Sequence, residues 1–274
     1  SKFSLNNIHF IGIGGIGMSG IAEVLFNLGY KVTGSDKTES KITKRLIDMG
    51  IEVHCNHSAS NLKKAEMVVV SSAIPETNPE IKEAKKRFIP ILSRAEMLSS
   101  LMNTKRGIAI AGTHGKTSTT SIIASVMTEA GLDPTFINGG IINSFNSNAQ
   151  LGKGEYLIAE ADESDQSFLL LQPSMSIITN IEPDHLVNYG NNFENLKKAF
   201  LDFIKKLPFN GKVIVCGDDP TVRELVPDFS RPYITYGFNE ENDYVLSNYS
   251  AQQFRSSFSL RHNKENLDLS FNML

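Results

Sequence analysis

Two glycine-rich loops, each placed directly after a short apolar run, constrain the fold of this chain more than any other feature. The first loop, Gly12-Ile13-Gly14-Gly15-Ile16-Gly17, follows Ile8–Ile11, and the second, Gly112-Thr113-His114-Gly115-Lys116-Thr117, follows Gly107–Ala111. A strand, a glycine-rich loop and a helix in this order bring backbone N–H groups to a phosphate. Two such units of different chemistry indicate an enzyme that joins two phosphorylated partners, one of them ATP.

Composition narrows the class of protein. The chain has 274 residues, 41% of them hydrophobic, which is enough to bury a core in each of two domains. A net charge of -3 gives no basic footprint for nucleic acid. Only two cysteines occur, Cys55 and Cys216, so a disulfide framework is excluded and a reducing compartment is expected. The apolar runs are too short to span a membrane. We therefore expect a cytoplasmic protein without nucleic-acid or membrane partners, and no pattern indicates an oligomeric state.

The first hundred residues alternate between strand-like and helix-like segments. Strands are predicted at 8–11, 31–33, 67–70 and 89–92, and helices at 19–28, 41–49, 79–86 and 93–102. Gly29 and Gly50 end two of these helices, and Ser93 and Glu96 have the spacing of a capping box. Repeated β-α units predict a parallel sheet with helices on both faces, in a Rossmann-like α/β domain. A polar break before the second loop places this domain at residues 1–105.

The remaining residues, 106–274, are predicted to form a second α/β domain. Helices are expected at 117–130 and 194–207, and strands at 156–159, 175–179 and 212–215. The later helix carries one apolar stripe, formed by Leu196, Phe200, Phe203, Ile204 and Leu207. The tail predicts an antiparallel hairpin around a turn at 262–266, with apolar positions at Phe254, Phe258, Leu260, Leu267, Leu269, Phe271 and Met273. Because ending on a strand is odd for an α/β domain, we expect the chain to be truncated within this one.

The first loop has the spacing of a dinucleotide site. Gly12, Gly14 and Gly17 satisfy the pattern G-x-G-x-x-G between a strand and a helix. Asp36 follows the second strand, where a carboxylate accepts hydrogen bonds from ribose hydroxyls. The pattern by itself indicates NAD, and the alternative is a tight turn that serves only packing.

The second loop indicates a triphosphate. Gly112, Gly115, Lys116 and Thr117 resemble a Walker A loop, but Ile110 stands where the usual spacing requires glycine, so this is a shortened variant. Successive N–H groups would surround the β-phosphate, and Lys116 would approach the β- and γ-phosphates. The hydroxyl of Thr117 would ligate Mg²⁺. The alternative is a lysine at the start of an ordinary helix.

Charged residues follow two further predicted strands. The segment 160–165 holds four carboxylates, which would repel one another unless cations neutralise them, and it lies where parallel sheets place their ligands. The segment 180–185 ends in His185, predicted to emerge at the same edge as Lys116 and Glu160. These positions predict a metal-binding role for Glu160 and His185, against the alternative of a solvated acidic loop. His54, His57 and His262 are interpreted as structural.

Four motifs, in order and in register, resemble the Mur ligases: residues 12–20, 111–118, 160–165 and 180–185. The resemblance implies a Rossmann-like domain for a UDP-sugar in place of NAD, a central P-loop-type ATPase domain, and a third domain that receives an amino acid. The pattern is most similar to members that join L-alanine to UDP-N-acetylmuramate with ATP through an acyl phosphate. The alternatives are a murein peptide ligase, a non-catalytic UDP-sugar- and ATP-binding fragment, and an NAD-dependent dehydrogenase.

The resemblance also implies roles for individual residues. The expected catalytic set is Lys116, Glu160 and His185. The expected ligands of two Mg²⁺ ions include Thr117, Glu160 and His185. ATP is expected at Gly112, Thr113, His114, Gly115, Lys116, Thr117 and Ser118. The UDP-sugar is expected at Gly12, Gly14, Gly15, Gly17, Met18, Ser19, Ser35, Asp36, Ser71, Ser72 and Arg94. The chain alone is expected to bind the UDP-sugar but to have little or no ligase activity.

Overall fold

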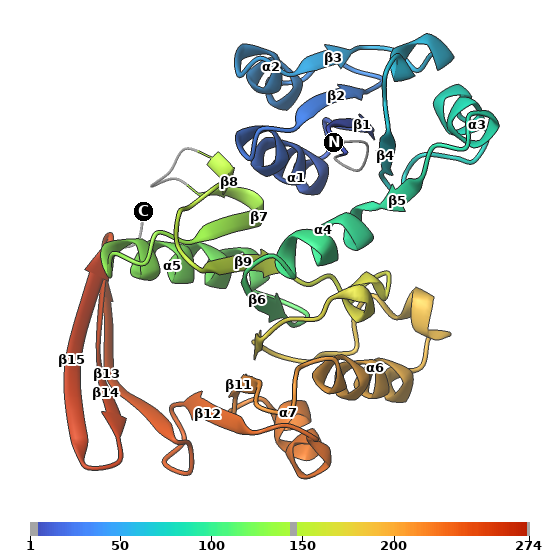
Figure 1. The fold of residues 1–274 in the computed structure, drawn as a ribbon. Helices are drawn as coiled ribbons and strands as arrows, with labels where there is room; N and C mark the ends of the chain where they lie inside the picture. Colours follow the sequence, from blue (N-terminus) through green and yellow to red (C-terminus); the bar gives the residue numbers. More distant parts are fainter. Residues whose placement is uncertain (1–4, 143–146, 273–274) are drawn as a thin grey trace.

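The structure, a computed structural model, describes residues 5–142 and 147–272 and contains two β-sheets (Figure 1). The first sheet is wholly parallel, in the order β3-β2-β1-β4-β5. Its strands are β1 (Asn7–Ile11), β2 (Lys31–Ser35), β3 (Glu52–His54), β4 (Met67–Val70) and β5 (Ile91–Ser93). Its helices are α1 (Ile16–Asn27), α2 (Lys41–Asp48), α3 (Pro79–Lys86) and α4 (Arg94–Met102). The Rossmann-like parallel sheet predicted from the sequence is confirmed.

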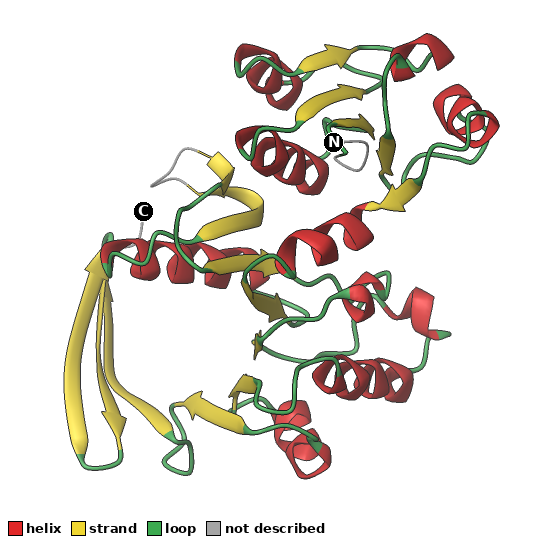
Figure 2. Ribbon diagram, viewed as in Figure 1, coloured by secondary structure: helices red, strands yellow, loops and turns green. Residues whose placement is uncertain are grey.

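Helices cover both faces of this sheet, as Figure 2 shows. Residues of α1, α2 and α4 pack in one core cluster, whereas Ile81 and Ala84 of α3 pack with Ile11 and Val68 in another. The predicted capping box at the start of α4 is present. Helix α1 begins three residues earlier than predicted, because the chain turns into the helix within the glycine loop itself.

The second sheet has ten described strands, in the order β15-β14-β13-β12-β11-β10-β6-β9-β7-β8. In chain order, the first eight strands of this sheet are β6 (Arg106–Ala111), β7 (Thr135–Ile142), β8 (Ser147–Gln150), β9 (Tyr156–Glu160), β10 (Met175–Ile178), β11 (Lys212–Cys216), β12 (Tyr233–Gly237) and β13 (Tyr244–Gln252). The last two are β14 (Arg255–His262) and β15 (Glu265–Asn272). The pairings from β7 through β13 are parallel, and the pairings of β7–β8, β13–β14 and β14–β15 are antiparallel. The second α/β domain predicted from the sequence therefore has a parallel centre with antiparallel margins.

Two helices sandwich the centre of this sheet. Helix α5 (Lys116–Glu129) packs on one face through Ala124, and α6 (Phe193–Lys205) packs on the other. The predicted apolar stripe of α6 is confirmed, since Phe200 and Phe203 are fully buried against Phe168. A short helix, α7 (Pro220–Leu225), and single 3₁₀ turns at 59–62, 167–170, 186–189 and 226–228 complete the described fold.

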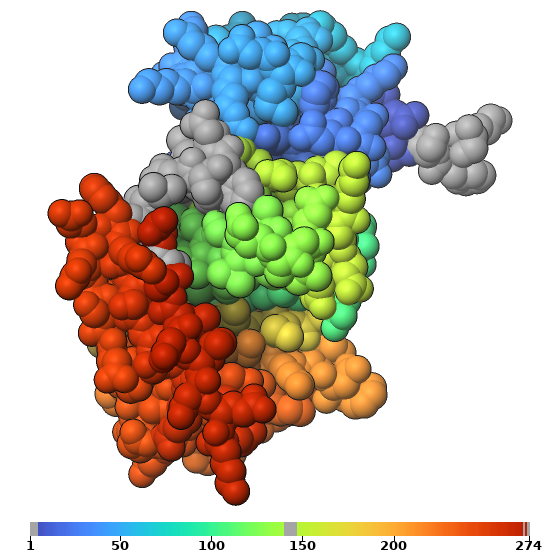
Figure 3. All heavy atoms as spheres, turned by 90° about the vertical axis from the view of Figure 1, so that its left-hand side faces the viewer, coloured from blue at the N-terminus to red at the C-terminus, as the bar shows by residue number. Residues whose placement is uncertain are grey.

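The predicted hairpin in the tail is confirmed, with Asn263 and Lys264 between β14 and β15. The hairpin forms the outer edge of the second sheet (Figure 1), its atoms lie on the face turned to the viewer in Figure 3 (red), and Leu267 is exposed. The prediction for Phe254 is wrong, because this exposed residue lies in the turn before β14. Met273 lies outside the described residues. Within the described part of the chain, none of the helices is long and apolar enough to cross a membrane.

The two sheets are tied together where β8 lies against α1. The amide of Asn148 in β8 donates to the carbonyl of Ile16 at 2.9 Å. Arg45 in α2 donates to both carboxylate oxygens of Glu23 in α1 at 2.7 Å, and to the hydroxyl of Ser147 in β8 at 2.7 Å. Burial raises the pKa of Glu23, and Arg45 opposes that shift. These contacts fix the first glycine loop relative to the second sheet.

Candidate functional site

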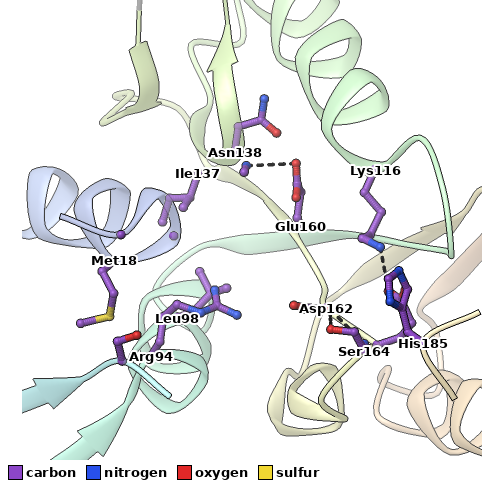
Figure 4. Close-up of a pocket in the computed structure, with 15 residues that line it drawn as sticks. Met18, Arg94, Leu98, Lys116, Ile137, Asn138, Glu160, Asp162, Ser164 and His185 are labelled. Carbon is purple, nitrogen blue, oxygen red and sulfur yellow. Dashed lines mark hydrogen bonds and ion pairs between the residues drawn. The ribbon is translucent and has the colours of Figure 1, made fainter. Parts of the chain in front are cut away.

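Both glycine loops open onto one cavity of about 400 Å³ between the two sheets (Figure 4). The first domain contributes the loop preceding α1, the end of β4 and the start of α4, and the second contributes Lys116, β7 and the ends of β9 and β10. The lining residues are Gly15, Gly17, Met18, Ser71, Arg94, Leu98, Lys116, Ile137, Asn138, Gly139, Glu160, Asp162, Glu163, Ser164 and His185. The predicted carboxylate-rich edge and the lysine of the second loop therefore face the same space.

The second loop is held by the segment that follows β10. Asn180 accepts a hydrogen bond from the His114 N–H at 2.8 Å through its side chain and one from the Thr113 N–H at 3.0 Å through its carbonyl. The hydroxyl of Thr179 donates to the His114 carbonyl at 2.6 Å. Gly112 has a φ of +133° and no room for a Cβ beside Thr179, so this position requires glycine. The motifs at 111–118 and 180–185 thus form a single structural unit.

Lys116 reaches the cavity from the first turn of α5. Its ammonium group donates to the Glu163 carboxylate at 2.8 Å, to the Gly112 carbonyl at 2.6 Å and to the Thr113 carbonyl at 3.4 Å. Burial raises the pKa of Glu163, and the contact with Lys116 opposes that shift. Of the seven residues predicted for ATP, only Lys116 lines the cavity, whereas Thr117 and Ser118 are exposed at the start of α5.

Glu160, the last residue of β9, is oriented by the neighbouring strand. Its carboxylate accepts a hydrogen bond from the backbone N–H of Gly139 in β7 at 3.0 Å (Figure 4). A Cβ at position 139 would lie 2.5 Å from the other oxygen of Glu160, so a larger residue there would displace this carboxylate. The carboxylate is therefore fixed at the cavity wall with one oxygen directed away from the backbone.

His185 is less constrained. It has a φ of +54°, its side chain is half exposed, and its Nε2 lies 3.7 Å from a carboxylate oxygen of Asp184. Over the described ranges, no three His, Cys, Asp or Glu side chains are already gathered around a common point that could hold a metal ion. The wall still fits Mg²⁺ chemically, because the carboxylates of Glu160 and Asp162 line the cavity and carboxylate oxygens are ligands that this ion prefers.

The first loop folds around the end of β2. The N–H groups of Gly12 and Ile13 donate to the Ser35 carbonyl at 2.8 and 3.0 Å, and the Gly14 N–H donates to the Asp36 carboxylate at 2.9 Å. Asp36 therefore holds the loop by one oxygen. This contact differs from the ribose contact that its position suggested.

The other residues predicted for the UDP-sugar divide into two groups. Gly15, Gly17, Met18, Ser71 and Arg94 line the cavity, whereas Ser72 is exposed outside it. Ser35 and Ser19, also predicted for the UDP-sugar, do not line the cavity. The Ser35 hydroxyl is fully buried and donates to Glu80 at 2.6 Å, and Ser19, 2% exposed, donates to the Ile16 carbonyl at 3.0 Å. Both hydroxyls point into the domain because the neighbouring elements satisfy them there.

The sequence interpretation did not single out a cluster beneath the first loop, centred on Glu80. This carboxylate, fully buried in α3, accepts hydrogen bonds from Ser35 and Asn61 and lies 3.0 Å from His9 Nε2 and 2.7 Å from His57 Nδ1. Burial acts to raise the pKa of Glu80, but these hydrogen bonds outweigh it and the pKa is lowered. The structural role interpreted for His57 agrees with this arrangement. The one sequence feature that could have indicated this cluster is Glu80 itself, an acidic residue on the buried side of a helix.

Comparisons with known proteins match both parts of the chain. Residues 7–106 match the model of the Mur ligase family catalytic domain, and residues 110–274 match that of the Mur ligase middle domain. The chain is 55% identical over 98% of its length to UDP-N-acetylmuramate–L-alanine ligase from Baumannia cicadellinicola subsp. Homalodisca coagulata, and it covers 55% of that relative.

Two solved structures share the fold. UDP-N-acetylmuramate–alanine ligase from Thermotoga maritima superposes with a TM-score of 0.84 at 33% identity, over 96% of this chain and 60% of that one. The UDP-N-acetylmuramate:L-alanyl-γ-D-glutamyl-meso-diaminopimelate ligase from Neisseria meningitides has the same TM-score at 25% identity, over 96% of this chain and 86% of that one. The chain thus spans little more than half the length of the Baumannia and Thermotoga alanine ligases.

Proposed function

The chain belongs to the Mur ligase family, and from that premise we propose that it serves the ATP-dependent ligation of L-alanine to UDP-N-acetylmuramate. The observation that carries the proposal is the single cavity onto which both glycine loops, Lys116 and Glu160 open. An enzyme that joins a phosphate donor to a sugar-nucleotide carboxylate requires both ligands in one space. We propose residues 1–105 as the UDP-sugar domain and 106–274 as the ATP domain, in a cytoplasmic protein.

We assign the phosphate contacts to the second loop. The backbone N–H groups at the start of α5 and the Lys116 ammonium would bind the β- and γ-phosphates of ATP. Glu160 and His185, with the Thr117 hydroxyl on the same loop, would hold magnesium. The metal, when bound, would neutralise the developing charge on the transferred phosphoryl group. Gly139 contributes by fixing the orientation of Glu160.

We assign the sugar nucleotide to the opposite wall. Gly15 and Gly17 present backbone at the start of α1, and Arg94 adds a cation on the same side of the cavity. Arginine is suited to bidentate contacts with a pyrophosphate or a carboxylate. In this arrangement the muramate carboxylate would be directed toward Lys116 and the γ-phosphate.

The reaction follows from this placement. A carboxylate oxygen of UDP-N-acetylmuramate attacks the γ-phosphorus, ADP leaves, and an acyl phosphate forms. The amine of L-alanine then attacks the acyl carbon, and inorganic phosphate leaves with the bonding electron pair while the amine loses a proton. No protein nucleophile is needed, so the residues of this cavity act by positioning the reactants and by neutralising charge.

The alternatives are distinguished by the family match. The NAD-dependent dehydrogenase, which the first loop alone allowed, is wrong because both halves of the chain match Mur ligase domains. The murein peptide ligase shares the fold equally, but the identity of 25% to such an enzyme is below the 55% and 33% to alanine-ligating relatives. L-alanine is therefore the acceptor that we propose.

The test measures phosphate release from the full-length protein with UDP-N-acetylmuramate, L-alanine and Mg-ATP. We expect release to require all three substrates and to be abolished by Lys116→Ala. Lys198→Ala, an exposed lysine of α6, is the control and should retain turnover. Calorimetry with UDP-N-acetylmuramate tests binding by residues 1–274 alone. Wild-type turnover in Lys116→Ala would contradict the assignment of the second loop, and binding without turnover in the full-length protein would favour a non-catalytic role.

A further inference from the structure

The most buried carboxylate in the cavity is Glu163, which the proposed chemistry does not use. Its relative exposure is 1%, and its Oε2 lies 2.8 Å from Lys116 Nζ. Glu160, which we assign to magnesium, lies three residues earlier in the same segment and accepts a hydrogen bond from the Gly139 N–H instead. The lysine therefore has a counterion of its own, separate from the predicted metal ligand.

The ammonium group of Lys116 is fully engaged by the protein. Its three N–H donors face three acceptors, namely Glu163 and the carbonyls of Gly112 and Thr113. The carboxylate is the strongest of these partners, because a hydrogen bond between two charged groups is roughly twice as strong as a neutral one. A phosphate that approaches Lys116 must therefore share or replace the contact with Glu163.

Glu163 is itself held rigidly. Its backbone carbonyl accepts a hydrogen bond from the Tyr189 hydroxyl and another from the Gln166 N–H at 3.1 Å. The Asn188 side chain donates to the carbonyl of the next residue, Ser164, at 2.8 Å. Tyr189 and Asn188 both belong to the 3₁₀ turn at 186–189, which directly follows His185. The carboxylate that orients Lys116 is thus anchored to the same segment that presents His185.

Only one of the two carboxylate oxygens of Glu163 has a hydrogen-bond partner within the described residues. The oxygen Oε1 is buried without a hydrogen-bond partner in the part of the chain that the structure describes, and the residue lines the cavity. An unpaired oxygen on a buried carboxylate lowers the stability of the fold, so its presence here points to a role other than stability. Here it places a negative charge beside the position that we propose for the terminal phosphate.

We propose that Glu163 is a positioning residue for Lys116 that holds the ammonium in the cavity and competes with the terminal phosphate of ATP for it. This inference rests on the proposed function. The competition weakens binding of the nucleotide in its ground state, whereas the fixed lysine favours phosphoryl transfer. Removing the charge of Glu163 should therefore move affinity and turnover in opposite directions. A residue that only supports the fold would lower both.

The experiment compares the full-length protein with Glu163→Gln and with Glu194→Gln. The control removes the same charge from another lysine pair, formed by Glu194 and Lys197 at 3.0 Å in α6. Calorimetry with Mg²⁺ and a non-hydrolysable ATP analogue gives affinity, and phosphate release gives kcat. We expect Glu163→Gln to bind the analogue about tenfold more tightly, as for removal of one screened charge. We expect its kcat to fall by roughly 10- to 100-fold, because the lysine is no longer fixed.

Unchanged or weaker binding by a folded Glu163→Gln protein would overturn the inference. A second variant, Glu163→Asp, keeps the charge and shortens the arm by one methylene, so it should retain wild-type affinity and lose kcat. Wild-type kcat in that variant would overturn the positioning role, even if the Gln variant does not fold. Failure of the wild-type protein to bind the analogue would overturn the proposed function as well, and the two failures are thereby distinguishable.

Discussion

The cluster centred on Glu80 gives the sharpest test of how the first glycine loop is held. We consider the replacement Glu80→Ala. It removes the acceptor of Ser35 and Asn61 and the partner of His9 and His57, all inside the first domain. Ser35 matters most, because its carbonyl receives the N–H groups at the start of the first loop. The replacement should therefore weaken both the domain and the loop.

The magnitude follows from burial. Glu80 is fully buried, and a hydrogen bond to a charged group contributes about 1.5–3 kcal/mol. The contributions are not additive within one network, and removal of one partner from a buried ion pair costs about 3–5 kcal/mol. We expect Glu80→Ala to lower the free energy of unfolding by about 4 kcal/mol. Glu80→Gln, which keeps the shape and half of the acceptor capacity, should lower it by about 2 kcal/mol.

The assay is urea unfolding followed by circular dichroism, with Glu83→Ala as the control in the same helix. Glu83 has no side-chain hydrogen bond or ion pair among those found in the described residues, so its replacement should change the free energy of unfolding by about 0.5 kcal/mol or less. Calorimetry with UDP-N-acetylmuramate in the same samples reports on the loop. Weaker binding is expected for both Glu80 variants and not for the control.

The effect should also depend on pH. The pKa of Glu80 is lowered from 4.5 in the folded protein, so the unfolded chain takes up its proton first as the pH falls. The stabilisation is therefore fully present above pH 4.5 and is lost as the pH falls through the folded pKa. The difference in stability between the wild type and Glu80→Gln should shrink over that range. A loss below about 1 kcal/mol at pH 7 for Glu80→Ala would refute the reasoning, because a buried ion pair broken on one side costs more.

Three further outcomes are expected. Gly139→Ala should reduce kcat by roughly tenfold or more at unchanged stability, since the added Cβ displaces the Glu160 carboxylate; phosphate release checks it. Asn148→Ala should lower the free energy of unfolding by about 1–2 kcal/mol and raise the KM for UDP-N-acetylmuramate, because the contact with the Ile16 carbonyl is lost; urea unfolding and steady-state kinetics check it. Phe200→Ala should lower the free energy of unfolding by about 3–5 kcal/mol at an unchanged m-value, through a cavity in the core, as urea unfolding would show.

Local signals in the sequence were sufficient wherever neighbouring residues determine the structure. Gly29 ends α1 with a φ of +97°, and Ser93 with Glu96 caps α4, both as predicted. Strand β7 was missed because Asn138 and Gly139, in the middle of a long strand, are residues typical of turns. That strand persists because its neighbours β8 and β9 pair with it along both edges, which no local pattern encodes.

Side-chain direction was harder to predict than position. The sequence placed Ser35 and Asp36 at a strand end, but it could not show that one hydroxyl faces the interior and the carboxylate turns back to Gly14. The same holds for Glu163, whose partner Lys116 lies 47 residues away in the chain. Contacts between distant segments decide which of several carboxylates meets a cation. The sequence by itself identifies only the carboxylate-rich segment 160–165 as a whole.

The alignment of the two glycine loops depends on a contact outside both of them. Asn148, at the edge of the second sheet, donates to the carbonyl of Ile16, which begins α1 directly after the first loop. Arg45 of α2 adds a second contact between the same two parts of the molecule, because its guanidinium donates to the Ser147 hydroxyl. Because attack on a phosphorus requires the reacting atoms to be positioned within a fraction of an ångström, the geometry of ligation would be set at this interface as much as at Lys116. If Asn148→Ala raised the KM for UDP-N-acetylmuramate without lowering kcat, the interface would be shown to position the sugar nucleotide and to leave the phosphate site intact.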